Sequence, residues 1–426
     1  MTSLGAMVLY IDPGTGSMLF TVLIGIIGFL LYIVRVFWIR IKFVITRGKA
    51  EQKNANKIPY LIFAEDKRYW QIFKPVCDEF EKRGIDVVYW TMTPDDPVFD
   101  LDYDHIKFEF IGEGNKAFAK LNVVNAGVVL STTPGLDVYQ WRRSKNADCY
   151  VHMFHSVGYG GYRMFGIDFY DAVLVAGQYQ IDIMRELERT RDLPAKDAAL
   201  VGMPYFDELR KKLDSSESVV NERTTVLLAP SWGEDSIFTR LGSKVIDELV
   251  KTDYDIIIRP HPQSFINDAE LMKTLMEKYP ENDHLRWDRS SDNFETLKKA
   301  DIMISDFSGV IFDYAFVFDK PVICLETGSF DTNCRDYYWL EPKYYWTRNN
   351  LSNLGKKLTA DNVNNLNDMI SECLASDELK QNRTATCEAA WAYPGEAAVR
   401  TVDYLVRKGS EIAGSESPDA SPEAKQ

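Results

Sequence analysis

Short runs of apolar residues recur between residues 58 and 326 and alternate with stretches of helical periodicity. The apolar runs are rich in Val, Ile and Leu and have the length of buried strands. In the first part of this region the predicted strands are residues 58–64, 85–92, 126–132, 148–155 and 171–177. The predicted helices are residues 66–83 and 181–192. This alternation predicts a parallel sheet that is covered by helices on both sides.

A polar stretch (KKLDSSESVVNER) interrupts this alternation, and we place a domain boundary there, at residues 214–223. A second alternating block follows, with predicted strands at residues 224–230, 254–260, 284–288, 301–306 and 320–326. The predicted fold is therefore α/β, with two doubly wound domains, residues 58–213 and 224–408, that face each other across a cleft. Residues 409–426 are small, polar and Pro-containing, which predicts a disordered tail.

An apolar run without charge, residues 18–34, precedes the first domain and resumes after Arg35 as far as Ile39. The whole stretch, residues 18–39, is long enough to cross a hydrocarbon core of about 30 Å. Asp12 is the one charged side chain before it. The basic residues at and after its end are Arg35, Arg40, Lys42, Arg47 and Lys49. The positive-inside rule then predicts a single-pass plasma-membrane anchor within residues 1–49 and a cytoplasmic catalytic domain. A buried or interfacial helix is an alternative, whereas a cleaved signal peptide fits poorly because no basic residue precedes the run.

The composition limits the kinds of molecule that the protein is expected to bind. A net charge of −14 does not favour nucleic-acid binding. The basic residues at and after the end of the apolar run contrast with the acidic remainder of the chain. Their positive charge suits contact with anionic lipid headgroups. The six cysteines contain no CxxC pair, so we expect reduced thiols rather than a disulfide framework or a zinc site.

Two strand ends in the second block carry the strongest chemical signal. Residues 254–262 read YDIIIRPHP, and residues 301–316 read DIMISDFSGVIFDYAF. Ligands of open α/β sheets bind at such strand ends. Arg259 supplies a forked positive charge that matches phosphate oxygens. His261 is held between two prolines, which stiffen the backbone and favour a role as a hydrogen-bond donor or acid.

The second of these segments predicts a phosphate site at the start of a helix. Ser308 and Gly309 lie where the helical spacing begins, and the unpaired N–H groups of a helix start attract anions. Ser305 or Asp306 would either contact the donor or cap this helix. Asp313 lies one turn further on, where it could reach a ribose hydroxyl or remain solvated.

Three other strand ends offer candidates. His155 ends a predicted strand and precedes the glycine-rich SVGYGGYR, so we expect it to be catalytic, whereas we interpret His152 as structural. Ser231 and Trp232 follow another strand and could meet a sugar or a base, although turn and packing roles are equally compatible. Glu326 closes a third strand and could accept hydrogen bonds from a ribose.

The R-P-H-P segment, the S-D-F-S-G-V-I-F-D-Y-A segment and the K-P strand together resemble the CDP-glycerol glycerophosphotransferase family of teichoic-acid-type polymerases and primases. The resemblance covers roughly residues 120–405. It implies a GT-B-like fold of two Rossmann-like domains. It also implies transfer of glycerol phosphate from CDP-glycerol to a hydroxyl of a membrane-linked acceptor, with release of CMP.

The same resemblance implies roles for particular residues. The two catalytic histidines of the family match His155 and His261. Contacts to the donor pyrophosphate and ribose are implied around Arg259, Ser308 and the segment from Asp306 to Asp313. The chain departs from the family pattern in three places: no lysine is evident after His155, Gly233 stands in place of an arginine, and Gly309 stands in place of a second serine. These departures leave open whether the donor carries glycerol or a related polyol, and whether the acceptor is lipid-linked or a cell-surface glycan.

Two other functions remain compatible with these motifs. One is a nucleotide-sugar glycosyltransferase or epimerase of the GT-B fold. The other is a non-catalytic, membrane-tethered binding protein. No acidic cluster with metal-ligand spacing appears, so the sequence requires no metal, although a divalent cation remains compatible with phosphoryl-type transfer.

Overall fold

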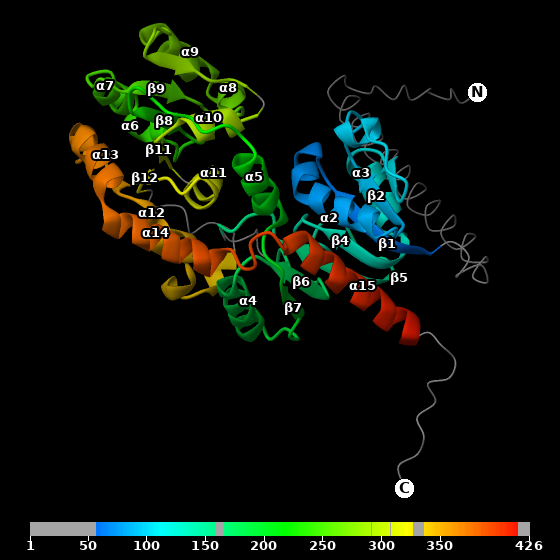
Figure 1. Ribbon diagram of the computed structural model, residues 1–426. Helices are drawn as coiled ribbons and strands as arrows, with labels where there is room; N and C mark the ends of the chain where they lie inside the picture. The colour runs from blue at the N-terminus through cyan, green and yellow to red at the C-terminus, as the bar shows by residue number, and fades with distance from the viewer. Residues whose placement is uncertain (1–56, 159–164, 291, 307, 327–335, 416–426) are drawn as a thin grey trace, which may run out of the picture. The chain divides into compact units, whose positions relative to one another are not determined.

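The computed structural model describes residues 57–158, 165–290, 292–306, 308–326 and 336–415 and contains two parallel β-sheets with flanking helices (Figure 1). The predicted membrane segment at residues 18–39 lies outside these ranges. None of the helices within them combines the length and the apolar character needed to span a bilayer.

The first sheet has seven parallel strands in the order β3-β2-β1-β4-β5-β6-β7. Its strands are β1 (Ile58–Ala64), β2 (Val87–Thr91), β3 (Ile106–Phe110), β4 (Asn125–Ser131), β5 (Asn146–Met153), β6 (Ala172–Val175) and β7 (Asp197–Leu200). In β1, Leu61 and Phe63 enter one hydrophobic core, while Ile62 and Ala64 enter another on the opposite face. Both faces are therefore buried, which explains the unbroken apolar run.

The second sheet has six parallel strands in the order β10-β9-β8-β11-β12-β13. Its strands are β8 (Thr225–Ala229), β9 (Asp255–Ile258), β10 (Leu285–Trp287), β11 (Ile302–Ser305), β12 (Val322–Leu325) and β13 (Lys357–Leu358). The central strand β8 shows the same division, because Val226 and Leu228 enter one core and Leu227 and Ala229 enter the other. The prediction of a second α/β sheet is thus confirmed.

The helices cover both faces of each sheet. Those associated with the first sheet are α2 (Trp70–Lys82), α3 (Gly114–Leu121), α4 (Gln178–Arg191), α5 (Pro204–Asp214) and α15 (Ala397–Ser415). Those around the second sheet are α6 (Ile237–Leu241), α7 (Lys244–Leu249), α8 (Ser264–Asn267), α9 (Ala269–Lys278), α10 (Phe294–Lys299), α11 (Val310–Phe312), α12 (Trp346–Leu354), α13 (Leu366–Ala375) and α14 (Asp377–Ala390). Short 3-10 turns, among them η2 (Lys67–Tyr69) and η5 (Asp336–Trp339), complete the fold.

The strand order reverses once in each sheet. The chain builds outward from β1 to β3 and then returns to place β4 on the other side of β1. It does the same from β8 to β10 before β11 joins the other side of β8. The loops after the two strands at such a reversal turn in opposite directions and leave a crevice at the carboxyl edge of the sheet.

The C-terminal helix α15 corrects two boundaries expected from the sequence. It packs beside α2 of the first half, where Asp403 pairs with Arg83 at 2.6 Å and Lys408 pairs with Asp197 at 2.7 Å (Figure 1). Residues 397–408, which we expected in the second domain, therefore belong with the first sheet. The helix also continues through Ser415, so residues 409–415 are helical rather than part of a tail.

A buried ion cluster fixes the chain beyond the glycine-rich segment that follows His155. Arg191, at the end of α4, pairs with Asp168 at 2.7 Å and also with Asp336. Their side chains are 4%, 4% and 0% exposed, respectively. Asp336 also accepts a hydrogen bond from the backbone N–H of Phe165 at 3.1 Å. One guanidinium thus ties two distant chain segments to α4.

We expect Arg191→Met to lower the free energy of unfolding by about 3–5 kcal/mol, because it leaves two buried carboxylates without a counter-charge. Arg189→Met is the matched control, since Arg189 lies on the same helix with a side chain 68% exposed. It should cost about 1 kcal/mol or less. Urea unfolding followed by tryptophan fluorescence would compare the variants. Equal effects of the two substitutions would contradict a structural role for the buried cluster.

Candidate active site

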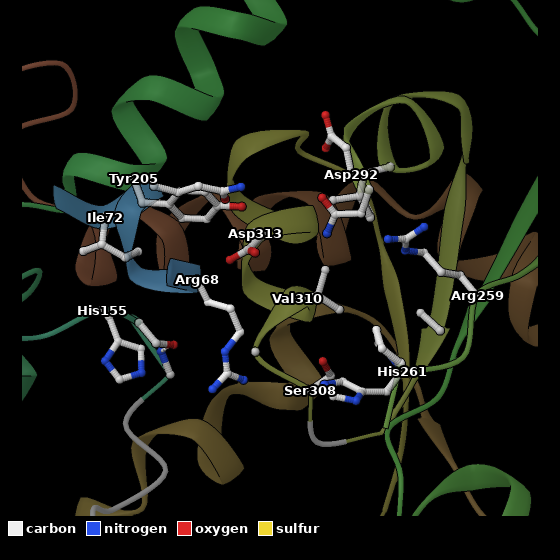
Figure 2. Close-up of a pocket in the computed structure, with 18 of the residues that line it drawn as sticks. Arg68, Ile72, His155, Tyr205, Arg259, His261, Asp292, Ser308, Val310 and Asp313 are labelled. Atoms are coloured by element: carbon white, nitrogen blue, oxygen red, sulfur yellow. Dashed lines mark hydrogen bonds between the residues drawn. The ribbon is translucent and has the colours of Figure 1, made fainter. Parts of the chain in front are cut away.

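A cavity of about 920 Å³ lies where the carboxyl ends of both sets of strands gather. Residues from the loops after β1, β4 and β5 line it together with residues from the loops after β8, β9 and β11. Its polar and charged lining residues are Arg68, Tyr69, Gln71, His155, Ser156, Tyr205, Arg259, His261, Asp292, Asn293, Ser308 and Asp313. Figure 2 shows His155 on one side, Ser308 and His261 on the other, and Arg68 drawn between them.

His155 follows β5 by two residues and lies in the cavity wall. Its ring packs edge-on against Tyr69, with 5.3 Å between the ring centroids. Burial, helped by the positive charge of Arg68, lowers the pKa of His155 to about 4. The imidazole is therefore neutral near pH 7 and can accept a proton. His152, by contrast, is fully buried and packs edge-on against Tyr170, as expected for a structural residue.

His261 is placed by its own backbone and by its neighbours. Its N–H donates to the carbonyl of Pro230 at 3.1 Å, which joins the loops after β8 and β9. The backbone N–H of Gln263 donates to Nδ1 of His261 at 3.1 Å. The proton of the neutral ring therefore resides on Nε2, which can donate a hydrogen bond. Partial burial and the charge of Arg68 lower the pKa of His261, which favours this neutral form.

Ser308 and Gly309 line the cavity directly before α11, as the helix-start prediction requires. The segment after His155 approaches this helix closely, because a Cβ atom at Gly309 would lie 3.9 Å from Ser156 Oγ. A Cβ atom at Gly158 would lie only 2.7 Å from the ring of Phe312. The absence of a side chain at Gly158 thus allows the His155 loop to pack against Phe312 of α11.

Asp313 also lines the cavity, one turn after Ser308. Burial raises the pKa of its carboxyl group to about 7. Asp313 can therefore hold or release a proton near neutral pH. Its position is compatible with the ribose contact considered from the sequence.

Arg259 lines the cavity, but its guanidinium is occupied. Nη1 donates to Asp288 at 2.6 Å and to Ser290 Oγ at 3.0 Å, and Nη2 donates to the Ser290 carbonyl at 2.8 Å. The pairing neutralises much of the positive charge that we expected to face a donor pyrophosphate. In the described structure Arg259 holds the loop after β10 against β9.

Five other predicted residues do not line the cavity. The buried carboxylate of Asp306 accepts hydrogen bonds from the N–H groups of Ser231 at 3.0 Å and Ile237 at 3.0 Å. Ser305 Oγ donates to the carbonyl of Ala229 at 2.6 Å. These contacts connect strand ends within the second sheet, so Ser231, Ser305 and Asp306 have packing roles here.

The remaining two are at the surface. The Trp232 ring is 43% exposed and lies 6.4 Å from the His261 ring, centroid to centroid. Glu326 accepts a hydrogen bond from Lys357 at 3.1 Å on the exposed side of β13. Trp232 thus lies beside His261 of the cavity wall, whereas Glu326 pairs with a residue of β13.

Sequence reasoning missed Arg68 and Tyr69, which follow β1 at the reversal of strand order in the first sheet. The signal was present in the predicted first strand and in the charged loop EDKRY that follows it. Among the described residues, no group of three or more His, Cys, Asp or Glu side chains is arranged to hold a metal ion.

These features define an α/β enzyme fold of GT-B-like type, with two parallel sheets contributing to one cavity. The sequence model of the family described as CDP-Glycerol:Poly(glycerophosphate) glycerophosphotransferase matches residues 164–340. This stretch contains His261, Ser308 and Asp313, and it begins shortly after His155. The match covers less than half of the chain, and this stretch resembles the family inferred from the motifs.

The comparison with an individual curated protein points to the same family. The chain is 25% identical over 166 residues to the teichoic acid glycerol-phosphate primase of Bacillus spizizenii (strain ATCC 23059 / NRRL B-14472 / W23). That match covers 36% of this chain and 39% of the primase, so the chain matches well under half of that relative's length.

Solved structures show the same fold. The wall teichoic acid polymerase TagF superimposes with a TM-score of 0.53 at 15% identity, covering 89% of this chain and 98% of that one. The UDP-GlcNAc 2-epimerase from Neisseria meningitidis, bound to UDP-GlcNAc, gives a TM-score of 0.54 at 13% identity, covering 82% and 99%. At these identities the similarity establishes the two-sheet architecture alone.

The histidines provide a test of the site. In an NMR titration of the imidazole signals, we expect His155 to titrate near pH 4 and His105, which pairs with Asp86, to titrate above its usual range. The folded-state pKa of His155 lies below the unfolded value of about 6.5. Its contribution to stability is therefore present above pH 6.5 and is lost as the pH falls toward 4. A His155 titration near pH 6.5 would contradict its burial in the cavity wall.

Proposed function

We propose that this protein transfers glycerol phosphate, or a related polyol phosphate, from a CDP-linked donor to a hydroxyl group of a lipid-linked or cell-surface glycan acceptor, with release of CMP. The observation that carries this proposal is the convergence of two neutral imidazoles, one from each sheet, on one cavity. The family match to residues 164–340 supports the same chemistry. A TagF variant soaked with CDPG has the same fold, with a TM-score of 0.51.

The proposed reaction uses both imidazoles. The acceptor hydroxyl oxygen attacks the phosphorus nearer the glycerol and forms the new P–O bond. The bond from that phosphorus to the oxygen of the CMP phosphate breaks, and CMP leaves with the bonding electrons. His155 accepts the proton of the hydroxyl, because its low pKa keeps the ring neutral. The Nε2–H group of His261 and the Ser308 hydroxyl donate hydrogen bonds to phosphate oxygens, where negative charge accumulates.

The test is the release of CMP from CDP-glycerol by the purified full-length protein, with UDP-GlcNAc as the competing donor. We expect His155→Asn and His261→Asn each to lower the rate by about 10²- to 10⁴-fold, because each removes a proton-transfer or hydrogen-bonding group. His284→Asn is the matched control, since His284 is 52% exposed and pairs with Asp255 away from the cavity.

Three results would count against the proposal. Full activity of both cavity variants with normal folding would remove these histidines from catalysis. UDP release from UDP-GlcNAc in place of CMP release would favour a nucleotide-sugar enzyme. A protein that binds CDP-glycerol without turning it over would favour the non-catalytic alternative.

We further propose that residues 18–39 anchor the protein in the plasma membrane with the catalytic cavity in the cytoplasm. The apolar run and the basic residues after it support this proposal. An anchor would keep the cavity near lipid-linked acceptors at the inner leaflet. We expect anchoring to favour the transfer reaction, because the acceptor that carries the hydroxyl group would be attached to the same membrane.

Fractionation of cells tests the anchor. The full chain should sediment with membranes and resist alkaline carbonate extraction. Ile26→Arg combined with Leu30→Arg should release it, because each central arginine costs about 2.5–3.5 kcal/mol on insertion. Ala50→Arg combined with Gln52→Arg adds the same charge outside the apolar run and should leave the protein in the membrane fraction. A wild-type chain that washes off in carbonate would argue for a peripheral association.

A further inference from the structure

The cavity lining contains two arginines, and they are not equivalent. Arg259 is held by the carboxylate of Asp288 at 2.6 Å. Arg68 has a side chain that is 76% exposed, and it pairs with Asp66 only through Nε, at 2.9 Å. Within the part of the chain that the structure describes, the two terminal nitrogens of Arg68 have no hydrogen-bond partner.

The loop that carries Arg68 is held in place at several points. Oδ1 of Asp66 accepts hydrogen bonds from both the backbone N–H and Nε of Arg68, at 2.9 Å each. The neighbouring Lys67 donates through Nζ to Asp95 at 2.6 Å and through its backbone N–H to Thr93 at 3.2 Å. The side chain of Arg68 is thus oriented by Nε while its outer edge stays available. Guanidinium edges with two parallel N–H groups match phosphate oxygens.

The positive charge of Arg68 affects the pKa values of both cavity histidines. After burial, its positive charge is the second cause of the lowered pKa of His155, and it has the same effect on His261. The two histidines come from different sheets, so a cation that influences both lies near the middle of the cavity. Figure 2 shows the guanidinium directed into the space between His155 and Ser308.

The described loops of the second sheet do not supply such a cation. Gly233, where the family pattern has an arginine, has a positive φ of 88°, and a side chain added there would have no atom within 4 Å. The other charged side chains of the cavity lining are the carboxylates Asp292 and Asp313. Among the described lining residues, one guanidinium therefore has N–H groups available for a diphosphate, and it comes from the first sheet.

We propose that Arg68 binds the diphosphate of the nucleotide donor and stabilises the negative charge that develops on the departing nucleotide phosphate. This inference rests on the proposed function for the identity of the nucleotide, but not for the recognition of a diphosphate. A cation contributed by the first sheet would contact the donor phosphates opposite Ser308. It would also make productive donor binding depend on residues from both halves of the chain.

The test compares Arg68→Gln with Lys67→Gln in the full-length protein. Both substitutions remove one positive charge from the same turn, but Lys67 pairs with Asp95 and does not line the cavity. Isothermal titration calorimetry would measure the affinity for CDP and for inorganic pyrophosphate. We expect Arg68→Gln to weaken both by about 10- to 100-fold, because charge-assisted hydrogen bonds are lost. Lys67→Gln should bind both like the wild type, and Arg68→Lys should recover part of the affinity.

A second measurement separates a direct role from a loss of folding. Arg68→Gln should raise the pKa values of His155 and His261 in the imidazole titration, whereas Lys67→Gln should leave them unchanged. Unaltered affinity for both ligands in Arg68→Gln would overturn the inference, as would a loss confined to the KM for the acceptor. A wild-type protein that binds pyrophosphate but neither binds CDP nor releases CMP would contradict the proposed donor. It would not contradict the proposed role of Arg68 in binding a diphosphate.

Discussion

Parallel strand pairing is the constraint on which the site depends. Every pairing between the strands of both sheets is parallel, so the loops that follow the strands gather at one edge of each sheet. Antiparallel pairing would send alternate loops to opposite edges. Because of this geometry, residues as distant in the sequence as Arg68, His155 and Ser308 can line the same cavity. The chemistry is thus carried by loops, while the strands and their cores only determine where those loops begin.

The sequence predicted the central strands of the sheets better than the edge strands and the position of the C-terminal helix. Central strands such as β1 and β8 are apolar on both faces, and that produces an unbroken run that is easily recognised. Three of the four edge strands, β3, β7 and β13, escaped prediction because they lack such an apolar run, whereas the fourth, β10, was predicted at residues 284–288. The packing of α15 against the first half could not be predicted either. Helical periodicity shows which face of a helix is buried but not which sheet it covers.

For the site, the sequence located strand ends but not the partners of the side chains there. His155, His261, Ser308 and Gly309 line the cavity because each lies in a loop shortly after a strand ends. The partner of Arg259 lies in another strand end, Asp288, and only the folded sheet brings the two together. Asp306 resembled a ligand-binding residue for the same reason, yet its carboxylate accepts hydrogen bonds from backbone N–H groups. A polar residue at a strand end can serve either purpose, and the sequence does not distinguish the two.

The return of α15 to the first half means that two covalent connections join the two sheets. One runs from α5 to β8, and the other from α14 to α15. A single linker would allow the halves to rotate about many axes. Two connections restrict the relative rotation of the halves more than a single linker would.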